Sequence, residues 1–152
     1  MTVKIRNYRA DDVQNIAELV RDAIKSAKFY TESEKAACAS AFCDLQELNI
    51  RLRSTRTLVA ELDGRTVGFG NLNVAFGCTA CVTAELDCLY VSPEYQGRGI
   101  GRAIVAELEV LARQSAVTAI KVYAASIDAK QFFQALGYTS VRENSMLLGR
   151  QF

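Results

Sequence analysis

The sequence predicts a mixed α/β fold, with helices covering the faces of one central sheet. Apolar residues alternate with polar ones in several short segments, as in half-buried strands, and recur with helical spacing in others. The predicted order is β-α-α-β-β-β-α-β-α-β-β, which gives about seven strands and about four helices. We find no repeat, low-complexity tract or interdomain linker, and 152 residues fit one domain. We therefore expect a single domain over residues 1–152.

The first part of the chain predicts a strand and two helices. Residues 3–8 alternate as a strand. Asp11, followed by Gln14, resembles a capping box that starts a first helix. Its apolar stripe consists of Val13, Ile16, Val20, Ile24 and Ala27. Thr31 and Glu34 repeat the capping signal before a second helix. The stripe of that helix consists of Cys38, Ala41, Phe42, Leu45 and Leu48.

The middle of the chain predicts three consecutive strands, over residues 57–62, 65–75 and 81–91. Asp63-Gly64 is a strong hairpin turn between the first two. The turn before the third carries Cys78-x-x-Cys81, a spacing found in zinc and redox sites. There is no second such pair and no histidine, so small half-buried residues near a hairpin are the favoured interpretation. We expect no metal site.

The end of the chain predicts a buried strand, a helix and a closing hairpin. Thr118 to Ala124 form the strand. Ser126 caps the helix, and Gly137 ends it. The apolar face of this helix consists of Ala129, Phe132, Phe133 and Leu136. Residues 138–142 and 145–150 then form the hairpin around Glu143-Asn144.

Composition and charge exclude several classes of function. The net charge of +1 argues against a nucleic-acid-binding protein, which usually carries a basic excess. No apolar run approaches the roughly 20 residues of a membrane span, and the N-terminus lacks a signal-peptide core. An odd number of cysteines without a secretion signal indicates reduced thiols, so we expect a cytoplasmic protein. The absence of histidine removes the usual general base.

The most informative segment is the run Leu89-Tyr90-Val91-Ser92-Pro93-Glu94-Tyr95-Gln96-Gly97-Arg98-Gly99-Ile100-Gly101. A strand ends at Pro93, and three alternating glycines open an amphipathic helix that runs to about Ser115. Such glycines let backbone amides approach a ligand, and the helix dipole favours an anion such as phosphate. The glycines follow several antiparallel strands late in the chain and do not lie in a first βαβ unit, which argues against a dinucleotide-binding fold. The absence of Gly-Lys-Ser/Thr argues against a P-loop.

Two motifs in this order resemble those of the GNAT N-acetyltransferase superfamily. Gln96-x-x-Gly99-x-Gly101 fits its Q/R-x-x-G-x-G/A signature. The second motif is the run Ser126-x-x-Ala129-x-x-Phe132-Phe133-x-x-x-Gly137-Tyr138. The resemblance implies a largely antiparallel sheet that splays between the fourth and fifth strands. It also implies acetyl-CoA as the cofactor, a homodimer in many members, and transfer of an acetyl group to a primary amine of a small molecule or peptide by direct attack in a ternary complex.

The resemblance also assigns the cofactor site. Backbone amides of residues 97–102 would hold the pyrophosphate, and Arg98 and Arg102 would add charge or remain ordinary solvated side chains. The main chain of residues 89–91 would pair with the pantetheine and polarise the thioester carbonyl. Ser126 stands where the family usually has Asn, and its reach is shorter. The implied set is Leu89, Tyr90, Val91, Gln96, Gly97, Arg98, Gly99, Ile100, Gly101, Arg102, Ser126, Ala129, Phe132 and Phe133.

Two carboxylates are candidates for the proton that the amine must lose. An alkylammonium has a pKa near ~10.4, so some group must accept the proton, directly or through water. Alternation predicts that Glu85, Asp87, Leu89 and Val91 share one face of their strand. Glu85 matches the position of the glutamate base in the histone acetyltransferase members, so it is the first candidate and Asp87 the second. The structural alternative is a carboxylate that is solvated or paired with an arginine.

One position departs from the family pattern. Many members carry a tyrosine there as general acid to the leaving thiolate, and this chain has Phe133. A thiol of pKa near ~8.5 can leave without a proton donor, or Tyr90, Tyr95, Tyr123 or water can substitute. The missing tyrosine also motivates an alternative function, a non-catalytic acyl-CoA-binding sensor or regulatory module.

The sequence contains fewer motifs for the site that would bind the acceptor amine. In the superfamily it is built from the first two helices, their connecting loop and the C-terminal hairpin. Here these supply Phe29, Tyr30, Thr31 and the Glu143-Asn144 turn. Phe29 and Tyr30 either line an acceptor pocket or serve as a hydrophobic staple for the second helix.

Overall fold

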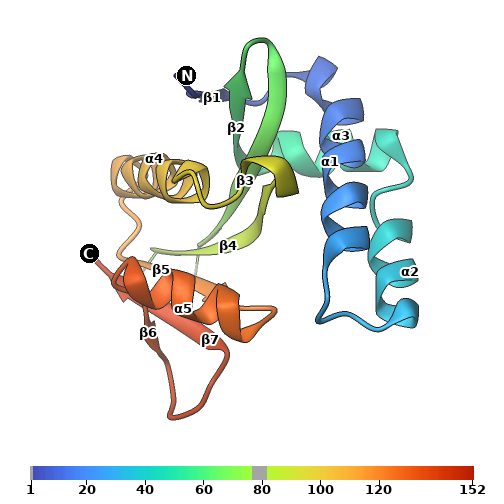
Figure 1. The fold of residues 1–152 in the computed structure, drawn as a ribbon. Helices are drawn as coiled ribbons and strands as arrows, with labels where there is room; N and C mark the ends of the chain where they lie inside the picture. Colours follow the sequence, from blue (N-terminus) through green and yellow to red (C-terminus); the bar gives the residue numbers. More distant parts are fainter. Residues whose placement is uncertain (1, 77–81) are drawn as a thin grey trace.

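The computed structural model describes residues 2–76 and 82–152, and their strands form one seven-stranded sheet (Figure 1). The strand order is β1-β2-β3-β4-β5-β7-β6, and every neighbouring pair is antiparallel except β4 and β5. The strands are β1 (Lys4–Asn7), β2 (Arg56–Leu62), β3 (Arg65–Phe76), β4 (Val82–Val91), β5 (Ala119–Tyr123), β6 (Thr139–Ser140) and β7 (Leu147–Gln151). The predicted mixed and largely antiparallel sheet is confirmed.

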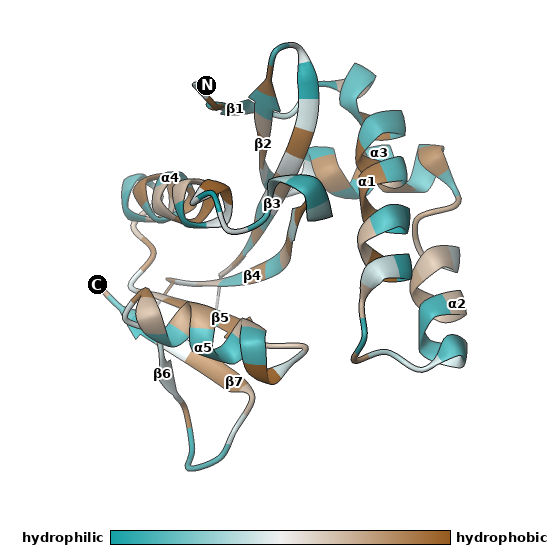
Figure 2. Cartoon of the chain, viewed as in Figure 1, coloured by the Kyte–Doolittle hydropathy of each residue, from teal (hydrophilic) through white to brown (hydrophobic). Residues whose placement is uncertain are grey.

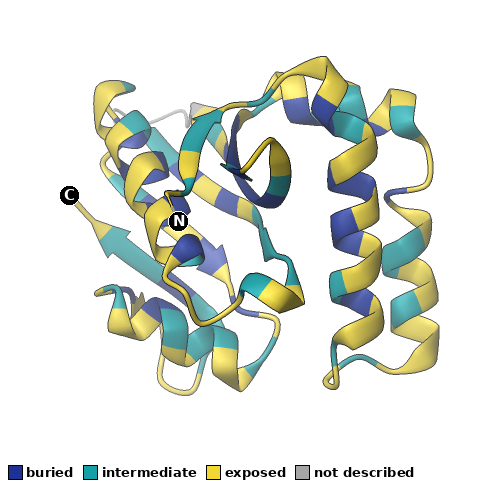
Figure 3. Cartoon of the chain, turned by 45° about the horizontal axis from the view of Figure 1, so that its top comes forward, coloured by how far each residue is buried: buried dark blue, intermediate teal, exposed yellow. Residues whose placement is uncertain are grey.

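Helices cover both faces of this sheet. They are α1 (Val13–Ser26), α2 (Glu32–Ser40), α3 (Leu45–Ser54), α4 (Ile100–Gln114) and α5 (Ile127–Ala135). The apolar stripe of α1 faces the sheet and its polar side faces solvent (Figures 2 and 3). Within the described residues, no helix is long and apolar enough to cross a membrane.

Alternation along the strands divides the core into two clusters. In β2, Leu58 packs in the cluster that contains α4 and α5, whereas Val59 packs in the cluster that contains α1 and α3. Ile104 of α4 and Ile16 of α1 are fully buried in these two clusters, respectively. Successive side chains of a strand point to opposite faces, so one strand supplies both cores.

The prediction of one long second helix is wrong, because the segment forms α2 and α3 and the described residues contain five α-helices. Asp44 ends the continuity: its side chain accepts hydrogen bonds from the backbone N–H groups of Gln46 (2.9 Å) and Glu47 (3.0 Å) and starts α3 as an N-cap. The capping box at the start of α2 is confirmed. The Thr31 N–H donates to the Glu34 carboxylate at 2.7 Å, and the Glu34 N–H donates to Thr31 Oγ1 at 3.2 Å.

The predicted capping box at Asp11 and Gln14 is also wrong. A 3₁₀ turn over Ala10–Asp12 precedes α1, and the Asp12 carboxylate accepts the Arg9 N–H at 2.7 Å. Both Asp12 oxygens also accept hydrogen bonds from the Arg6 guanidinium at 2.8 Å. Burial alone would raise the pKa of Asp12, but these hydrogen bonds hold it below its usual value.

The predicted hairpin at Asp63-Gly64 is confirmed. Both residues have positive φ, at 49° and 77°, as the tight turn between β2 and β3 requires. The predicted turn at residues 77–80 lies outside the described residues, as do Cys78 and Cys81.

A buried carboxylate in α4 joins three elements. Glu109 is buried, and its Oε2 lies 3.6 Å from Arg113 Nη2, one turn further along α4. Tyr138 Oη and Arg150 Nη1 donate to Glu109 Oε1 at 3.1 and 3.0 Å. The same Arg150 nitrogen donates to the Leu136 carbonyl at the end of α5 at 2.7 Å. Glu109 therefore ties α4 to β7 and to the segment that follows α5.

Replacing Glu109 by Ala should lower the free energy of unfolding by about 1–3 kcal/mol, because Tyr138 Oη and Arg150 would each lose a partner in a partly buried site. Urea unfolding followed by circular dichroism measures this loss. Glu107→Ala is the matched control, since Glu107 is exposed on the same helix. Equal midpoints for the two variants would contradict a stabilising role of Glu109.

Candidate active site

A cleft opens where β4 and β5 separate. Residues 83–86 of β4 pair with residues 119–122 of β5, and beyond them β4 continues without β5 as a neighbour. A cavity of about 870 Å³ lies at this splay, bordered by the end of α1 and its following loop, β4, the glycine loop, the end of β5, and α5. The predicted splay between the fourth and fifth strands is confirmed.

The cleft brings together most of the predicted site residues. Those that line it are Phe29, Tyr30, Asp87, Leu89, Tyr90, Val91, Gln96, Gly97, Gly99, Ile100, Gly101, Arg102, Ser126, Ala129, Phe132 and Phe133. Glu85 and Arg98 are not among the lining residues. The three tyrosines considered as substitutes for the missing acid, Tyr90, Tyr95 and Tyr123, also line the cleft.

The glycine loop has the conformation of an anion-binding turn. Gly97 and Gly99 have φ of +74° and +80°, which residues with a Cβ rarely adopt. A Cβ at either position would meet open space, so the requirement is conformational. At Gly101 an added Cβ would lie 3.3 Å from Phe132 Cζ. This glycine lets the start of α4 pack closely against α5.

Donors at the start of α4 are available to a ligand. Within the described residues, the N–H groups of Gly97, Arg98 and Gly99 donate no hydrogen bond, and the first amides of α4 have no helical acceptor. Arg98 lies over the Tyr95 ring at 5.3 Å, and neither Arg98 nor Arg102 forms a salt bridge in the described part of the chain. Free amides, the helix dipole and two cations together fit a pyrophosphate.

Two polar side chains shape the two edges of the cleft. Gln96 Nε2 donates to the Val91 carbonyl at 3.0 Å and so closes the loop onto the end of β4. The Ser126 hydroxyl accepts the Ala129 N–H at 3.1 Å, which confirms its predicted role as the N-cap of α5. The Ser126 O–H hydrogen remains available as a donor.

The prediction that Glu85, Asp87, Leu89 and Val91 share one face is wrong. A β-bulge interrupts the alternation, because Asn71 of β3 pairs with Cys88 whereas Leu72 pairs with Leu86. Asp87 is the additional residue of the bulge. After the bulge, odd-numbered residues of β4 face the side of the sheet that even-numbered residues face before it. Leu89 and Val91 pack with the α4 cluster, as Ala84 and Leu86 do, and the two carboxylates lie on the opposite face.

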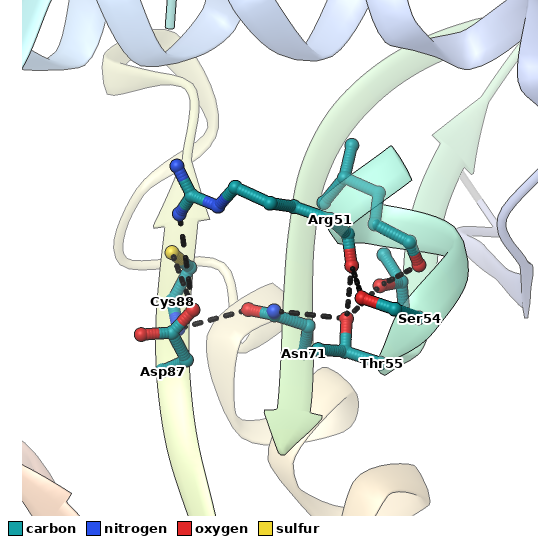
Figure 4. A network of polar contacts seen from close by, with 8 residues as sticks. Arg51, Ser54, Thr55, Asn71, Asp87 and Cys88 are labelled. Carbon is teal, nitrogen blue, oxygen red and sulfur yellow. Dashed lines mark hydrogen bonds and ion pairs between the residues drawn. The ribbon is translucent and has the colours of Figure 1, made fainter. Parts of the chain in front are cut away.

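The two carboxylates have different surroundings. Asp87 is half-exposed and lines the cleft, and its Oδ2 lies 4.0 Å from Arg51 Nη2 (Figure 4). Glu85 is exposed, outside the cleft lining, and opposite Lys121 of β5 in the strand register. Arg51 was not predicted, because only the tertiary structure brings α3 next to the β4 bulge.

Cys88 follows Asp87 and also lines the cleft. Burial, and next the neighbouring Asp87 carboxylate, raise the pKa of the Cys88 thiol to about 12. Burial likewise raises the pKa of Tyr90, whose ring stacks on Phe69 with centroids 5.7 Å apart. Both groups therefore stay protonated near neutral pH, and Cys88 is a poor nucleophile.

Aromatic side chains occupy both ends of the cleft. Phe29 and Tyr30 follow α1 with ring centroids 4.4 Å apart, and Phe29 is 52% exposed. Phe133 is buried between Phe132 and Tyr138, with centroid distances of 5.1 and 5.5 Å. Phe133 thus contributes to the core of the α4 side.

Comparison with known proteins decides the family. A family model described as "Acetyltransferase (GNAT) domain" matches residues 53–140, which is more than half of the chain. The chain belongs to the GNAT acetyltransferase family. It is therefore an acyltransferase that uses acetyl-CoA, as its two motifs predicted.

Relatives of this GNAT protein are similar over most of its length. An uncharacterized N-acetyltransferase, YafP, of Escherichia coli (strain K12) is 27% identical over 141 residues, covering 93% of this chain and 84% of YafP. Thialysine N-epsilon-acetyltransferase of Bos taurus is 26% identical, covering 93% and 86%. The crystal structure of PaiA N-acetyltransferase of Thermoplasma acidophilum, a complex with coenzyme A, has the same fold, with a TM-score of 0.87, 19% identity and full coverage of both chains.

The raised pKa of Cys88 predicts slow alkylation. At neutral pH its reaction with iodoacetamide should be at least about a hundredfold slower than that of an ordinary free thiol, and should accelerate until the pH approaches about 12. The exposed Cys43 serves as the internal comparison, read by peptide mass spectrometry. Asp87→Asn should accelerate the Cys88 reaction, because a nearby negative charge is removed. Equal rates at Cys88 and Cys43 would refute the prediction.

Proposed function

We propose that this protein transfers an acetyl group from acetyl-CoA to a primary amine of a small molecule or peptide, by direct attack in a ternary complex. One observation carries the proposal: a single cleft connects the amide-rich start of α4 to a carboxylate, Asp87, and an aromatic pair, Phe29 and Tyr30. The PaiA structure, which shares the fold and is a complex with coenzyme A, supports coenzyme A as the donor, and the thialysine enzyme's name supports an amine acceptor.

The donor half would be held mainly by backbone. Amides of residues 97–102 would bind the pyrophosphate, with Arg98 and Arg102 adding charge. The main chain of residues 89–91 would hold the pantetheine and polarise the thioester, and Ser126 would donate to the same arm. Bound acetyl-CoA supplies an activated acyl group with a thiolate leaving group. Ala129 and Phe132 would provide the apolar wall of this half.

Asp87 is the proposed proton acceptor, ahead of Glu85. Asp87 lines the cleft and is half-exposed, so an amine or an intervening water can reach it, whereas Glu85 lies outside the lining. In this step the attacking nitrogen would lose a proton to Asp87 as it bonds to the acetyl carbon, and the carbon–sulfur bond of the thioester would break, so that coenzyme A leaves as the thiolate. Tyr90 stays protonated because burial raises its pKa, and its hydroxyl is a candidate hydrogen-bond donor in the cleft.

Direct attack is favoured over an acyl-enzyme intermediate. Of the cysteines that the structure describes, Cys88 lines the cleft, and its pKa of about 12 keeps it neutral. The sequence also lacks the histidine that would activate such a thiol. Transfer would then require both substrates in the cleft at the same time.

The charges of the cleft favour an acceptor with one positive charge. Its acidic lining residues are Asp87 and Asp128, and its basic ones are Lys28 and Arg102. A polyamine would bring several positive charges to a lining that offers no excess of carboxylates. A monoamine with an apolar body matches Asp87 together with Phe29 and Tyr30.

The direct test is an acceptor screen with acetyl-CoA. Aromatic monoamines, lysine-like amines, polyamines and peptide N-termini are incubated with the protein, and acetylated product is measured by mass spectrometry. We expect turnover of monoamines with an apolar body. Binding of coenzyme A without product from any amine would instead support the non-catalytic acyl-CoA-binding module.

Paired carboxylate variants test the proton acceptor. Asp87→Asn should lower kcat by about a hundredfold, the usual contribution of a general base, with the Kd for coenzyme A changed by less than about twofold. Glu85→Gln, on the same face of β4, should leave both values near those of the parent protein. A large loss in Glu85→Gln with an unchanged Asp87→Asn would reverse the assignment.

Paired glycine variants test the pyrophosphate site. Gly99→Val should weaken coenzyme A binding by at least about tenfold, because valine disfavours the φ of +80° that orients the loop amides. Gly64→Val is the matched control, since Gly64 has φ +77° and open space but lies in the β2–β3 turn. Calorimetric titration measures both. An unchanged Kd in folded Gly99→Val would argue against the loop as the phosphate site.

A further inference from the structure

A buried asparagine holds the backbone of the β4 bulge. Asn71 is 3% exposed, and its Oδ1 accepts the Cys88 N–H at 2.9 Å (Figure 4). This amide belongs to the bulge, where the regular register between β3 and β4 shifts. The Asn71 side chain thus provides the hydrogen-bond acceptor for the backbone N–H of Cys88, the residue that follows Asp87.

Asn71 is in turn fixed by α3. Its Nδ2 donates to Thr55 Oγ1 at 3.1 Å, and Thr55 Oγ1 donates to the Arg51 carbonyl at 3.2 Å. Thr57 Oγ1 lies 3.0 Å from Thr55 Oγ1 and donates to the Leu52 carbonyl at 2.8 Å. These bonds leave the asparagine amide a single orientation, with its oxygen toward β4.

The contacts close into a ring at Arg51. The Arg51 carbonyl accepts the Thr55 hydroxyl, and the Arg51 guanidinium lies within 4.0 Å of Asp87 (Figure 4). The guanidinium carbon also lies 5.7 Å from the centroid of the Phe42 ring. One end of α3 therefore contacts both the backbone that carries Asp87 and its carboxylate.

We propose that Asn71 and Arg51 are positioning residues that set the place of the Asp87 carboxylate in the cleft, at the end that Phe29 and Tyr30 line. This inference rests on the proposed role of Asp87 as proton acceptor. Asn71 acts through the bulge backbone, and Arg51 acts through charge on the carboxylate oxygen. Neither contacts the reacting atoms. A displacement of about 1 Å in such a group can cost up to a hundredfold in rate.

The first experiment compares two asparagines of β3. Asn71→Ala should lower kcat/KM for the best amine of the acceptor screen by about tenfold or more, while the Kd for coenzyme A stays within about twofold. Amide exchange of Cys88, followed by NMR, should accelerate because its acceptor is lost. Asn73→Ala is the matched control: Asn73 lies two residues along the same strand and is exposed.

The second experiment substitutes no fully buried residue. Arg51→Met removes the charge beside Asp87 and should lower kcat more than it changes the KM for acetyl-CoA, with a shifted pH profile of kcat. Arg51→Lys retains the positive charge and should restore part of the rate. Arg53→Met is the control, since Arg53 is exposed two residues further along α3. These variants decide the proposal if Asn71→Ala does not fold.

The outcomes separate this inference from the proposed function. Slow transfer in Asp87→Asn, Asn71→Ala and Arg51→Met, with normal controls, supports both. Slow transfer in Asp87→Asn with normal rates in folded Asn71→Ala and Arg51→Met overturns the positioning role and keeps the function. Normal transfer in Asp87→Asn overturns the role of Asp87 and the positioning inference with it, while acetyl transfer itself stands.

Discussion

Pairing between β4 and β5 ends after residues 86 and 122, and the cleft depends on this early end. A strand that stops pairing leaves its N–H and C=O groups without partners on that side, and they must then be satisfied by water or by a ligand. The same separation opens space between α1, the glycine loop and α5, where the cavity lies. The start of α4 contributes free amides to one end, because a helix cannot satisfy its first N–H groups.

The β4 bulge gives the two halves of this cleft different chemistry. Before it, the side chains of Ala84 and Leu86 enter the core beneath α4, and after it Leu89 and Val91 do so. The residue between them, Asp87, is left half-exposed at the splay beside Arg51. A strand without the bulge would keep strict alternation and turn Leu89 and Val91 away from α4. The arrangement holds because Asn71 satisfies the bulge amide of Cys88.

Local signals were sufficient for much of the fold. The Thr31–Glu34 box, the Asp63-Gly64 turn and the cap at Ser126 are formed by residues close in sequence, and the structure confirms each. The incorrect predictions concern segments in which a neighbouring side chain forms hydrogen bonds that the local sequence pattern does not reveal. Asp44 interrupts an otherwise continuous apolar stripe because its carboxylate accepts the N–H groups of Gln46 and Glu47. The Asp11–Gln14 box does not form, and the carboxylate of Asp12 instead accepts hydrogen bonds from the Arg9 N–H and the Arg6 guanidinium.

The sequence by itself determined the family, the order of the strands along the chain and the glycine loop, since these depend on periodicity and on backbone conformations that glycine permits. It also supplied most of the glycine-loop and α5 residues that line the donor half of the cleft, but not those at the end of β5, Val122 and Ala124. Only the tertiary structure decided which carboxylate lines that cleft. The bulge arises from the register between β3 and β4, and the Arg51–Asp87 contact from the docking of α3. Both join residues distant in sequence, and neither leaves a periodic signal that one chain could reveal.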